Sequence, residues 1–367
     1  MGNQLETILK ELIERPSTTN NITSSTEIID YVYNLLTSVK VAYVKKGAIN
    51  SFSYLIATTQ QPNDRMIWFI GHLDVVPADE SMFQLTSDDK NYYGRGVFDM
   101  KGMAAAILAA FINLPELEKA NVGLMFTTDE EIGGRNGVGA LVKDFKGAAA
   151  FVLDGSTDFV LQEKIKGVLW LEIVAKGVAT HGSRPWLGQS ANEELVDYLH
   201  QFKAWYKANM PQKAPHNYFT TFNLGKIVGG KATNQVSDEA IASIDIRFVS
   251  EEDASKMLEA ANSIAKKCRN ITVNVLLKDP AIILDVDSPW CKRTIELINT
   301  LGITPGDDTH RYAHGSNDGR YLVPLNIPII VTRPAGGNQH AEGEWVSKEG
   351  LAKLEQLCAI LMEETKS

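Results

Sequence analysis

Residues 66–74 of the chain read MIWFIGHLD. The apolar run at the start is typical of a buried strand, and the polar residues His72 and Asp74 follow it at once. Similar β-rich runs alternate with segments whose apolar residues recur at helical spacing. The β-rich runs are 52–57, 66–70, 122–127, 149–153 and 327–332, and the later helical segments include 101–112, 289–301 and 347–362. This alternation predicts an α/β domain built on a mostly parallel sheet.

The middle of the chain follows a different order of elements. Between residues 167 and 279 the pattern predicts strand, helix, strand, strand, helix, strand, which is the β-α-β-β-α-β order of a ferredoxin-like module. Because the α/β pattern resumes afterwards, we expect the module to be inserted into the larger domain. The predicted organisation is therefore 1–166 for the first part of the α/β domain, 167–279 for the module and 280–367 for the second part.

Composition and charge narrow the classes of partner. The chain holds 36 Lys and Arg residues against 45 Asp and Glu residues, and no long basic block, so we do not expect it to bind nucleic acid. No apolar run approaches the roughly 20 residues of a membrane helix, and residues 1–15 are too charged for a signal peptide. The three cysteines are far apart, which argues against a thiolate zinc site. We expect a cytoplasmic protein that does not bind membranes.

Polar side chains with metal-binding chemistry follow several of the predicted strands. His72 comes two residues before Asp74, whose carboxylate can accept the proton of the second ring nitrogen and so orient the imidazole. The other candidates are Asp99 in GRGVFDMKG, Glu130 and Glu131 in TTDEEIGG, Asp154 in LDG, and His340 in GGNQH. Because open α/β sheets bind ligands at the carboxyl ends of their strands, we expect these residues to meet there.

Taken singly, each candidate has an ordinary structural explanation. An aspartate can cap a helix, an acidic pair can lie in a solvated turn, and most histidines that follow a strand are not ligands. Together, two histidines and three carboxylates form an oxygen-rich donor set that suits two divalent ions, with zinc expected and cobalt or manganese able to substitute. Adjacent side chains leaving a strand point in opposite directions, so one of Glu130 and Glu131 can bind metal while the other transfers protons.

Six motifs, in chain order, resemble the zinc aminoacylase and carboxypeptidase family that includes acetylornithine deacetylase and succinyl-diaminopimelate desuccinylase. They are GHLDVVP, GRGVFDMKG, TTDEEIGG, ATHGSRPWLGQSA, KATNQVSD and HGSNDGRYL, and the resemblance spans nearly the whole chain. The resemblance implies two zinc ions per subunit, each held by one histidine and one acid and bridged by a third acid: His72 with Asp154, His340 with Glu131, and Asp99.

The resemblance also implies roles for residues outside this ligand set. Glu130 would be the general base, Asp74 would orient His72, and the peptide between Asp99 and Met100 would be cis. The implied substrate contacts are His181, Asn234 and Arg247 in the inserted module, together with Gly315 and Ser316. His181 would reach the active site of the partner subunit and stabilise the developing oxyanion. The module would therefore be the lid and dimerisation domain of a homodimer.

These roles predict amide hydrolysis by a metal-activated water and a Glu general base. The implied substrate is a small N-acyl amino acid with a free carboxylate, which the forked guanidinium of Arg247 suits. One departure from the pattern opens an alternative, because many deacylases and carboxypeptidases of the family have Glu-Pro where this chain has Asp154-Gly155. Asp is similar to the peptidase branch, so a di- or tripeptidase on the same scaffold is the second hypothesis. A non-catalytic metal-binding dimer is the third, and it would be expected to lack Glu130 or a ligand.

Overall fold

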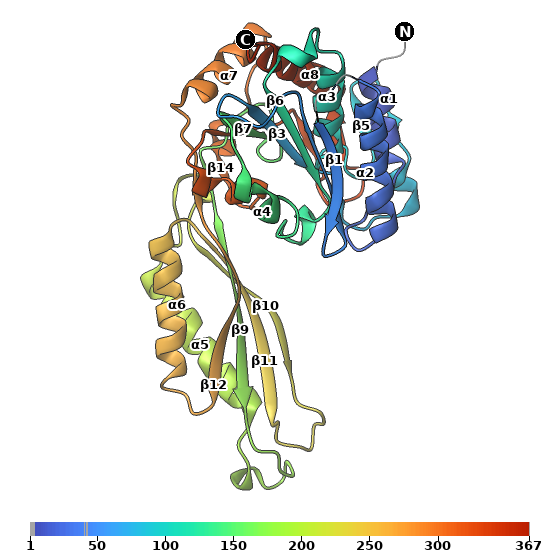
Figure 1. Cartoon of the computed structure of the whole chain (residues 1–367). Coiled ribbons are helices and arrows are strands. Elements are labelled where there is room, and N and C mark those ends of the chain that lie inside the picture. The colour runs from blue at the N-terminus through green and yellow to red at the C-terminus, as the bar shows by residue number, and fades with distance from the viewer. Residues whose placement is uncertain (1–3, 40, 42, 367) are drawn as a thin grey trace. The chain divides into compact units, whose positions relative to one another are not determined.

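The computed structural model describes residues 4–39, 41 and 43–366, and the chain divides into two compact units (Figure 1). The first unit contains Met1–Glu163, Leu284–Ala313 and Asn317–Ser367, and the second contains Lys164–Ile283 and His314–Ser316. The second unit includes two short strands that lie outside 167–279, β8 (Lys164–Ile165) and β13 (Ile282–Ile283). These connecting segments pair with each other, and so they stay with the inserted module.

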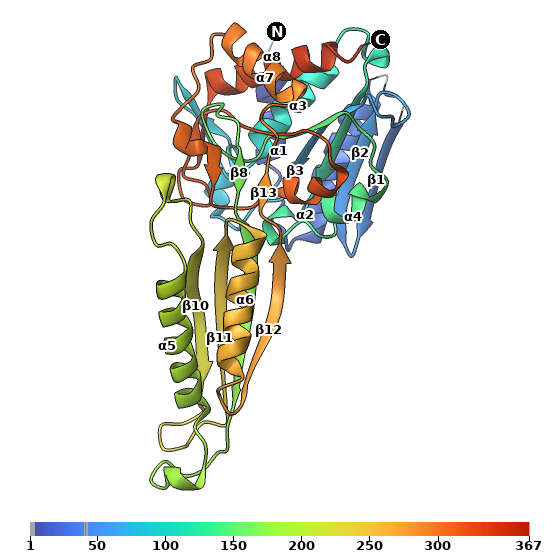
Figure 2. The same cartoon turned by 90° about the vertical axis from the view of Figure 1, so that its left-hand side faces the viewer.

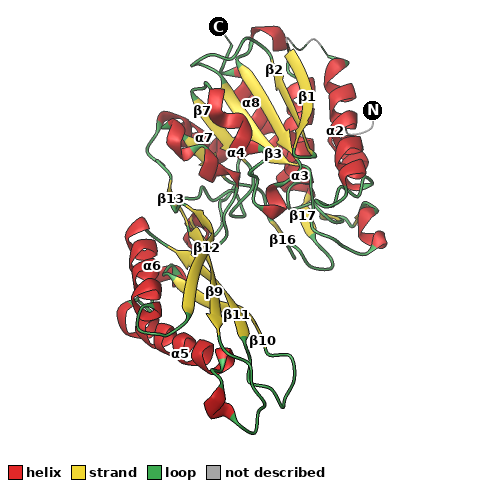
Figure 3. Cartoon of the chain, turned by 60° about the horizontal axis from the view of Figure 1, so that its bottom comes forward, coloured by secondary structure: helices red, strands yellow, loops and turns green. Residues whose placement is uncertain are grey.

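The first unit is built on a mixed six-stranded sheet with the order β1-β2-β6-β3-β7-β15 (Figure 3). Its strands are β1 (Tyr43–Ile49), β2 (Phe52–Thr58), β3 (Ile67–His72), β6 (Val122–Thr127), β7 (Ala149–Val152) and β15 (Ile329–Val331). The last four run parallel, whereas β1 and β2 complete one edge in antiparallel fashion. β3, β6 and β7 are buried along their whole length, as expected for parallel strands covered on both faces. The predicted α/β fold with a mostly parallel sheet is confirmed.

Helices and a second, small sheet complete the first unit. The helices are α1 (Gln4–Ile13), α2 (Ile22–Thr37), α3 (Lys101–Ile112), α4 (Val138–Leu141), α7 (Pro289–Thr300) and α8 (Lys348–Glu363). The small antiparallel sheet has the order β16-β17-β5-β4 and contains β4 (Thr86–Ser87), β5 (Asn91–Tyr93), β16 (Gly336–Gly337) and β17 (Trp345–Ser347), and a further short strand is β14 (Tyr312–Ala313). None of the described helices has the length and apolar character needed to cross a membrane.

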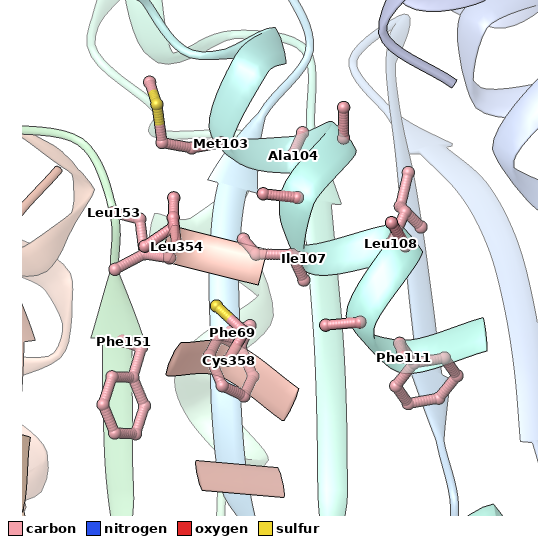
Figure 4. Close-up of a cluster of buried hydrophobic side chains, with 14 of the residues drawn as sticks. Phe69, Met103, Ala104, Ile107, Leu108, Phe111, Phe151, Leu153, Leu354 and Cys358 are labelled. Atoms are coloured by element: carbon pink, nitrogen blue, oxygen red, sulfur yellow. The ribbon is translucent and has the colours of Figure 1, made fainter. Parts of the chain in front are cut away.

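One hydrophobic core holds this unit together. α3 has the sequence KGMAAAILAAFI and is buried over Lys101–Phe111, because it carries no polar stripe. Figure 4 shows Ile107 of α3 close to Phe69 of β3 and Leu354 of α8, with Phe151 of β7 in the same cluster. This packing fixes β3 and β7, two of the strands whose ends carry candidate site residues.

The second unit consists of β9 (Gly167–Lys176), α5 (Ala191–Asn209), β10 (Thr221–Gly229), β11 (Glu239–Phe248), α6 (Glu251–Ala265) and β12 (Ile271–Asp279), together with β8 and β13. The four long strands form an antiparallel sheet in the order β10-β11-β9-β12, and α5 and α6 cover one face of it (Figure 2). Alternate residues of β9 and β11 are buried under these helices, while the residues between them, except the buried Val168, are partly or fully exposed. The predicted β-α-β-β-α-β order is confirmed.

Candidate metal centre and substrate residues

Three neighbouring parallel strands carry candidate residues at their carboxyl ends. β3 ends at His72, β6 is followed by Glu130 and Glu131, and β7 is followed by Asp154. These strands are adjacent in the order β6-β3-β7, so polar side chains that leave them meet at one edge of the sheet. The remaining candidates come from loops of the same unit, one before α3 and one after β16: Asp99 and His340.

Asp99 lies between the two histidines. Its Oδ1 is 3.1 Å from Nε2 of His72, and its Oδ2 is 3.1 Å from Nε2 of His340. Nε2 of His340 is also 3.2 Å from Glu131 Oε2, and Nε2 of His72 is 3.8 Å from Asp154 Oδ2. The structure therefore brings the five expected ligands into one cluster with Asp99 at its centre.

Two overlapping groups in this cluster could each hold a metal ion. One group is His72, Asp99 and Glu131, the other is His72, Glu130 and Asp154, and within each group one ligand atom per residue lies within 4.8 Å of the others. Imidazole nitrogens and carboxylate oxygens are donors that zinc, cobalt and manganese accept. The donor set therefore fits divalent cations. The second group includes Glu130, to which the resemblance assigns proton transfer.

The carboxylates of the cluster are buried close together, and this shifts their pKa values. Burial and the neighbouring Asp99 carboxylate raise the pKa of Asp154 to about 6. Burial also raises the pKa of Glu130 well above its usual value. Hydrogen bonds with Asp99 and Glu131 raise the pKa of His340 to about 10. Buried acids crowded around the two histidines form an environment that favours cations.

Asp74 contacts Nδ1 of His72 through both its main chain and its carboxylate. Nδ1 of His72 donates to the main-chain carbonyl of Asp74 at 3.0 Å, and the carboxylate Oδ1 is more distant at 3.4 Å. Since a carbonyl oxygen only accepts, Nδ1 carries a proton and Nε2 faces Asp99. The Asp74 carboxylate also accepts hydrogen bonds from the main-chain amides of Glu130 (3.3 Å) and Glu131 (3.2 Å). Asp74 thus holds the turn that carries both glutamates.

Glu344, which sequence reasoning missed, holds the loop that carries Asp99. Its side chain is 0% exposed, and it accepts four hydrogen bonds from this loop, from Nη1 of Arg95 (2.7 Å) and from the amides of Gly96 (3.0 Å), Phe98 (2.9 Å) and Asp99 (3.1 Å). The Asp99–Met100 peptide in this loop is cis. The sequence feature that could have pointed to Glu344 is its place in the same segment as His340.

Two further arginines, which the sequence did not single out, lie against the cluster. Nη1 of Arg333 donates to Asp154 Oδ1 at 3.3 Å, and its Nη2 donates to Gln339 Oε1 at 3.0 Å. Nη2 of Arg320 lies 3.9 Å from Glu130 Oε1. Both arginines are buried, whereas most arginines in loops are exposed. Only the folded structure therefore shows that these two arginines belong to the site.

Two of the expected substrate residues are neighbours in the second unit. The amide of Gly182 donates to the carbonyl of Asn234 at 2.7 Å, which places Asn234 beside the loop of His181. The amide of Ser183 donates to Nδ1 of His181 at 3.1 Å. Because Nδ1 is an acceptor, the proton of this imidazole is on Nε2, and the side chain is exposed.

The other expected substrate residues also belong to the second unit. Arg247 lies on β11, where the carboxylate of Asp245 accepts hydrogen bonds from its Nε at 2.9 and 3.2 Å. Gly315 and Ser316 are part of the short segment His314–Ser316 of this unit. The expected metal ligands thus lie in the first unit, and the expected substrate contacts lie in the second.

Comparisons with known proteins agree with this architecture. The family described as Peptidase family M20/M25/M40 matches residues 68–364. A probable carboxypeptidase of Paracoccidioides lutzii is 33% identical over 238 residues, which are 59% of this chain and 53% of that protein. The chain spans about half the length of the curated relatives it matches.

Two solved structures resemble the fold over almost its whole length. An M20 family metallo-carboxypeptidase from Sulfolobus solfataricus has a TM-score of 0.77 at 17% identity, covering 99% of both chains. A tripeptidase from Staphylococcus aureus has a TM-score of 0.75 at 20% identity, covering 99% of this chain and 97% of that one. Since the family match extends from the strand that carries His72 to the last helix, the chain belongs to peptidase family M20/M25/M40.

Proposed function

We propose that the protein is a zinc-dependent amidohydrolase that cleaves the amide bond of a small N-acyl amino acid with a free carboxylate. The observation that carries this proposal is the position of Asp99 between His72 and His340, with Glu130 in the same cluster. An acid shared by two histidines suits a pair of divalent ions, and a further acid beside them suits proton transfer. This arrangement supports hydrolysis by water, without a nucleophilic side chain.

The distances favour a division of the ligands between two zinc ions. His72 and Asp154 would hold one ion, His340 and Glu131 the other, and Asp99 both, because each histidine lies near Asp99 and near its own second acid. When bound, the ions polarise the scissile carbonyl and lower the pKa of water. Cobalt or manganese could take the same positions, since both accept nitrogen and oxygen donors.

Glu130 is the proposed general base. Its side chain is 12% exposed, and Asp74 holds its main-chain amide, so the carboxylate has a defined place near His72. It would take the proton of the attacking water and deliver it to the leaving nitrogen. The neighbouring Glu131 contacts His340 instead, which supports different tasks for the two glutamates.

We further propose a homodimer formed through the second unit, in which His181 acts in the active site of the partner subunit. The proton on Nε2 of His181 leaves this nitrogen ready to donate to a developing oxyanion. Asn234, Arg247, Gly315 and Ser316 would hold the substrate, with Arg247 on its carboxylate. The three cysteines are free, which fits the reducing cytoplasm as the place of action.

A di- or tripeptidase is the second candidate function, and two observations favour it. Asp154 stands where many deacylases and carboxypeptidases of the family have glutamate, and one of the similar solved structures described above is a tripeptidase. A non-catalytic metal-binding dimer is less consistent with the site, because Glu130 and the five expected ligands are all present and close together.

A substrate panel on the zinc-loaded protein tests the proposal. The panel contains N-acetylornithine, N-succinyl-diaminopimelate, Ala-Ala and Ala-Ala-Ala, and release of the free amine is measured. We expect cleavage of an N-acyl amino acid, and the variant Glu130→Gln serves as the inactive control. Cleavage of the peptides alone would establish the second candidate, and no cleavage by a protein that holds two zinc ions would contradict both.

A further inference from the structure

A surface cavity lies between the C-terminal ends of two helices of the first unit, α3 and α8. Its volume is about 710 Å³, and residues from the last turn of each helix line it. Small-molecule sites typically have volumes of roughly 300–1,000 Å³. The cavity is remote from the metal centre, because α3 begins two residues after Asp99, runs for about 18 Å and carries the cavity at its other end.

Short apolar side chains create the space between the two helices. Leu354 and Cys358 of α8 belong to the hydrophobic core (Figure 4), whereas Ala359, one position after Cys358, lines the cavity. Ala110 of α3 lines it as well, and Ile360 adds a larger apolar surface. An alanine ends at its Cβ, so these positions leave an apolar floor that a hydrocarbon chain or ring can cover.

The rim of the cavity is acidic. Its glutamates are Glu355, Glu363 and Glu364, and no lysine or arginine is found among the described lining residues. Two of these charges are compensated, because Lys366 donates to Glu363, and Nε of Arg293 donates to both oxygens of Glu364, at 2.9 and 3.1 Å.

Glu355 is the glutamate whose charge remains uncompensated. The side chain is half-buried, and in the described part of the chain it forms no hydrogen bond or ion pair. Burial raises the pKa of this carboxyl group, which shows that its ionised form is poorly solvated. A single cation placed beside Glu355 would restore the lost interactions. The cavity thus combines one uncompensated negative charge with an apolar floor.

The backbone of the two helices adds to this preference for positive charge. The last turn of a helix carries partial negative charge, because its carbonyl groups point along the axis without amide partners in the helix. α3 ends at Ile112 and α8 ends at Glu363, and both last turns line the cavity. Two helix ends and Glu355 therefore favour a cation at this place and disfavour an anion.

We propose that this cavity is a binding site for a small organic cation that has one protonated amine and an apolar chain or ring. The ammonium group would pair with Glu355, and the apolar part would cover Ala110, Ala359 and Ile360. The match of one positive charge to one uncompensated carboxylate carries the choice of ligand class, together with the volume of the cavity. The site is distinct from the metal centre, and the inference does not depend on the proposed hydrolase activity.

Probes that share one chain and differ in charge test the proposal. Calorimetry on the zinc-loaded protein compares n-octylamine, 1-octanol and octanoate. We expect the amine to bind about 10-fold more tightly than the alcohol, the gain typical of a hydrogen bond between charged groups at a partly exposed site, and octanoate not to bind. Raising the ionic strength from about 0.01 M to about 0.1 M should weaken binding of the amine and leave binding of the alcohol unchanged.

Three variants on α8 locate the site. Glu355→Gln keeps the size of the side chain and removes its charge, so it should weaken n-octylamine about 10-fold and spare 1-octanol. Ala359→Phe fills the cavity and should abolish binding of both. Glu349→Gln is the matched control, because Glu349 lies on the same helix, pairs with Lys353 at the surface and does not line the cavity. It should bind both probes like the wild type.

Several outcomes would overturn the proposal. They are no binding of n-octylamine, equal affinity for n-octylamine and 1-octanol, and equal effects of Glu355→Gln and Glu349→Gln. Amine binding that survives Ala359→Phe and disappears in Glu131→Ala would place the amine at the metal centre instead. A molecular mass in sedimentation that falls in Ala359→Phe, without amine binding in the wild type, would assign the cavity to a second copy of the chain. If Ala359→Phe does not fold, the three probes and Glu355→Gln still decide.

Discussion

The variant Glu344→Gln tests how the chain positions Asp99. The carboxylate of Glu344 accepts two hydrogen bonds on each oxygen, and glutamine retains only one oxygen. If that oxygen stays with the amides of Phe98 and Asp99, the new amide group faces two donors, Arg95 and Gly96. Arg95 is itself buried, so the change leaves a buried cation without its partner.

The expected losses of stability and of metal affinity follow from these contacts. Two buried donors without acceptors cost about 1–3 kcal/mol each. Breaking a buried ion pair by removing one partner costs about 3–5 kcal/mol, and the two figures agree. We therefore expect the free energy of unfolding to fall by about 3–5 kcal/mol. Because the loop that carries Asp99 loosens, the affinity for metal should also fall, by roughly 10- to 100-fold, as for other changes to groups that orient a ligand.

Urea unfolding and competition with a chelator measure the two effects. Glu349→Gln is the control, because Glu349 is 78% exposed and pairs with Lys353 on the surface. That change should cost no more than about 0.5 kcal/mol and leave metal affinity unchanged. Arg95→Leu should lower stability but keep metal affinity nearer to that of the wild type, since the Glu344 carboxylate still holds the Asp99 amide. Glu344→Gln with the stability and metal affinity of the wild type would refute the positioning role.

Three further predictions concern the proposed ligands and proton donors. Glu130→Ala should keep its metal and lose at least ~10²–10⁴ in turnover, because a base that touches only water acts in the transition state, and near-normal turnover in the metal-replete variant would contradict this role. Glu131→Ala and His340→Ala should each weaken one of two bound ions, and two full equivalents of metal in both variants would argue against the ligand assignment. Mixed inactive subunits, Glu130→Ala with His181→Ala, should regain roughly a quarter of native activity through hybrid dimers, whereas proven subunit exchange without recovered activity would place His181 outside the site of the partner.

Much of the fold and of the candidate site could be predicted from local sequence patterns. Strands and helices differ in the period of their apolar residues, and this period is visible within a few residues. The apolar run at 66–70 therefore predicts β3, and the polar residues that follow it predict a site at the end of the sheet. Some of the expected metal ligands can also be located from local sequence, because His72 and Asp154 each stand at or just after the end of a parallel strand.

Other contacts of the candidate site form between segments that are distant in the chain. The Asp74 carboxylate was expected beside His72, and folding brings it to the main-chain amides of Glu130 and Glu131 as well. Arg333 reaches Asp154 from the other end of the sequence, after β15. Nothing in the sequence around these residues signals such contacts, because an arginine or aspartate in a loop is ordinarily solvated.

Glu344 shows most clearly what only the tertiary structure decides. The sequence by itself determined the order of strands and helices, the inserted module and the set of histidines and acids, because these follow from local periodicity and from residue type. Only the tertiary structure decided that Glu344 is buried under four hydrogen-bond donors. The physical reason is that burial and pairing of a charge are set by packing between segments far apart in the chain, and the free energy of a charge depends on that packing.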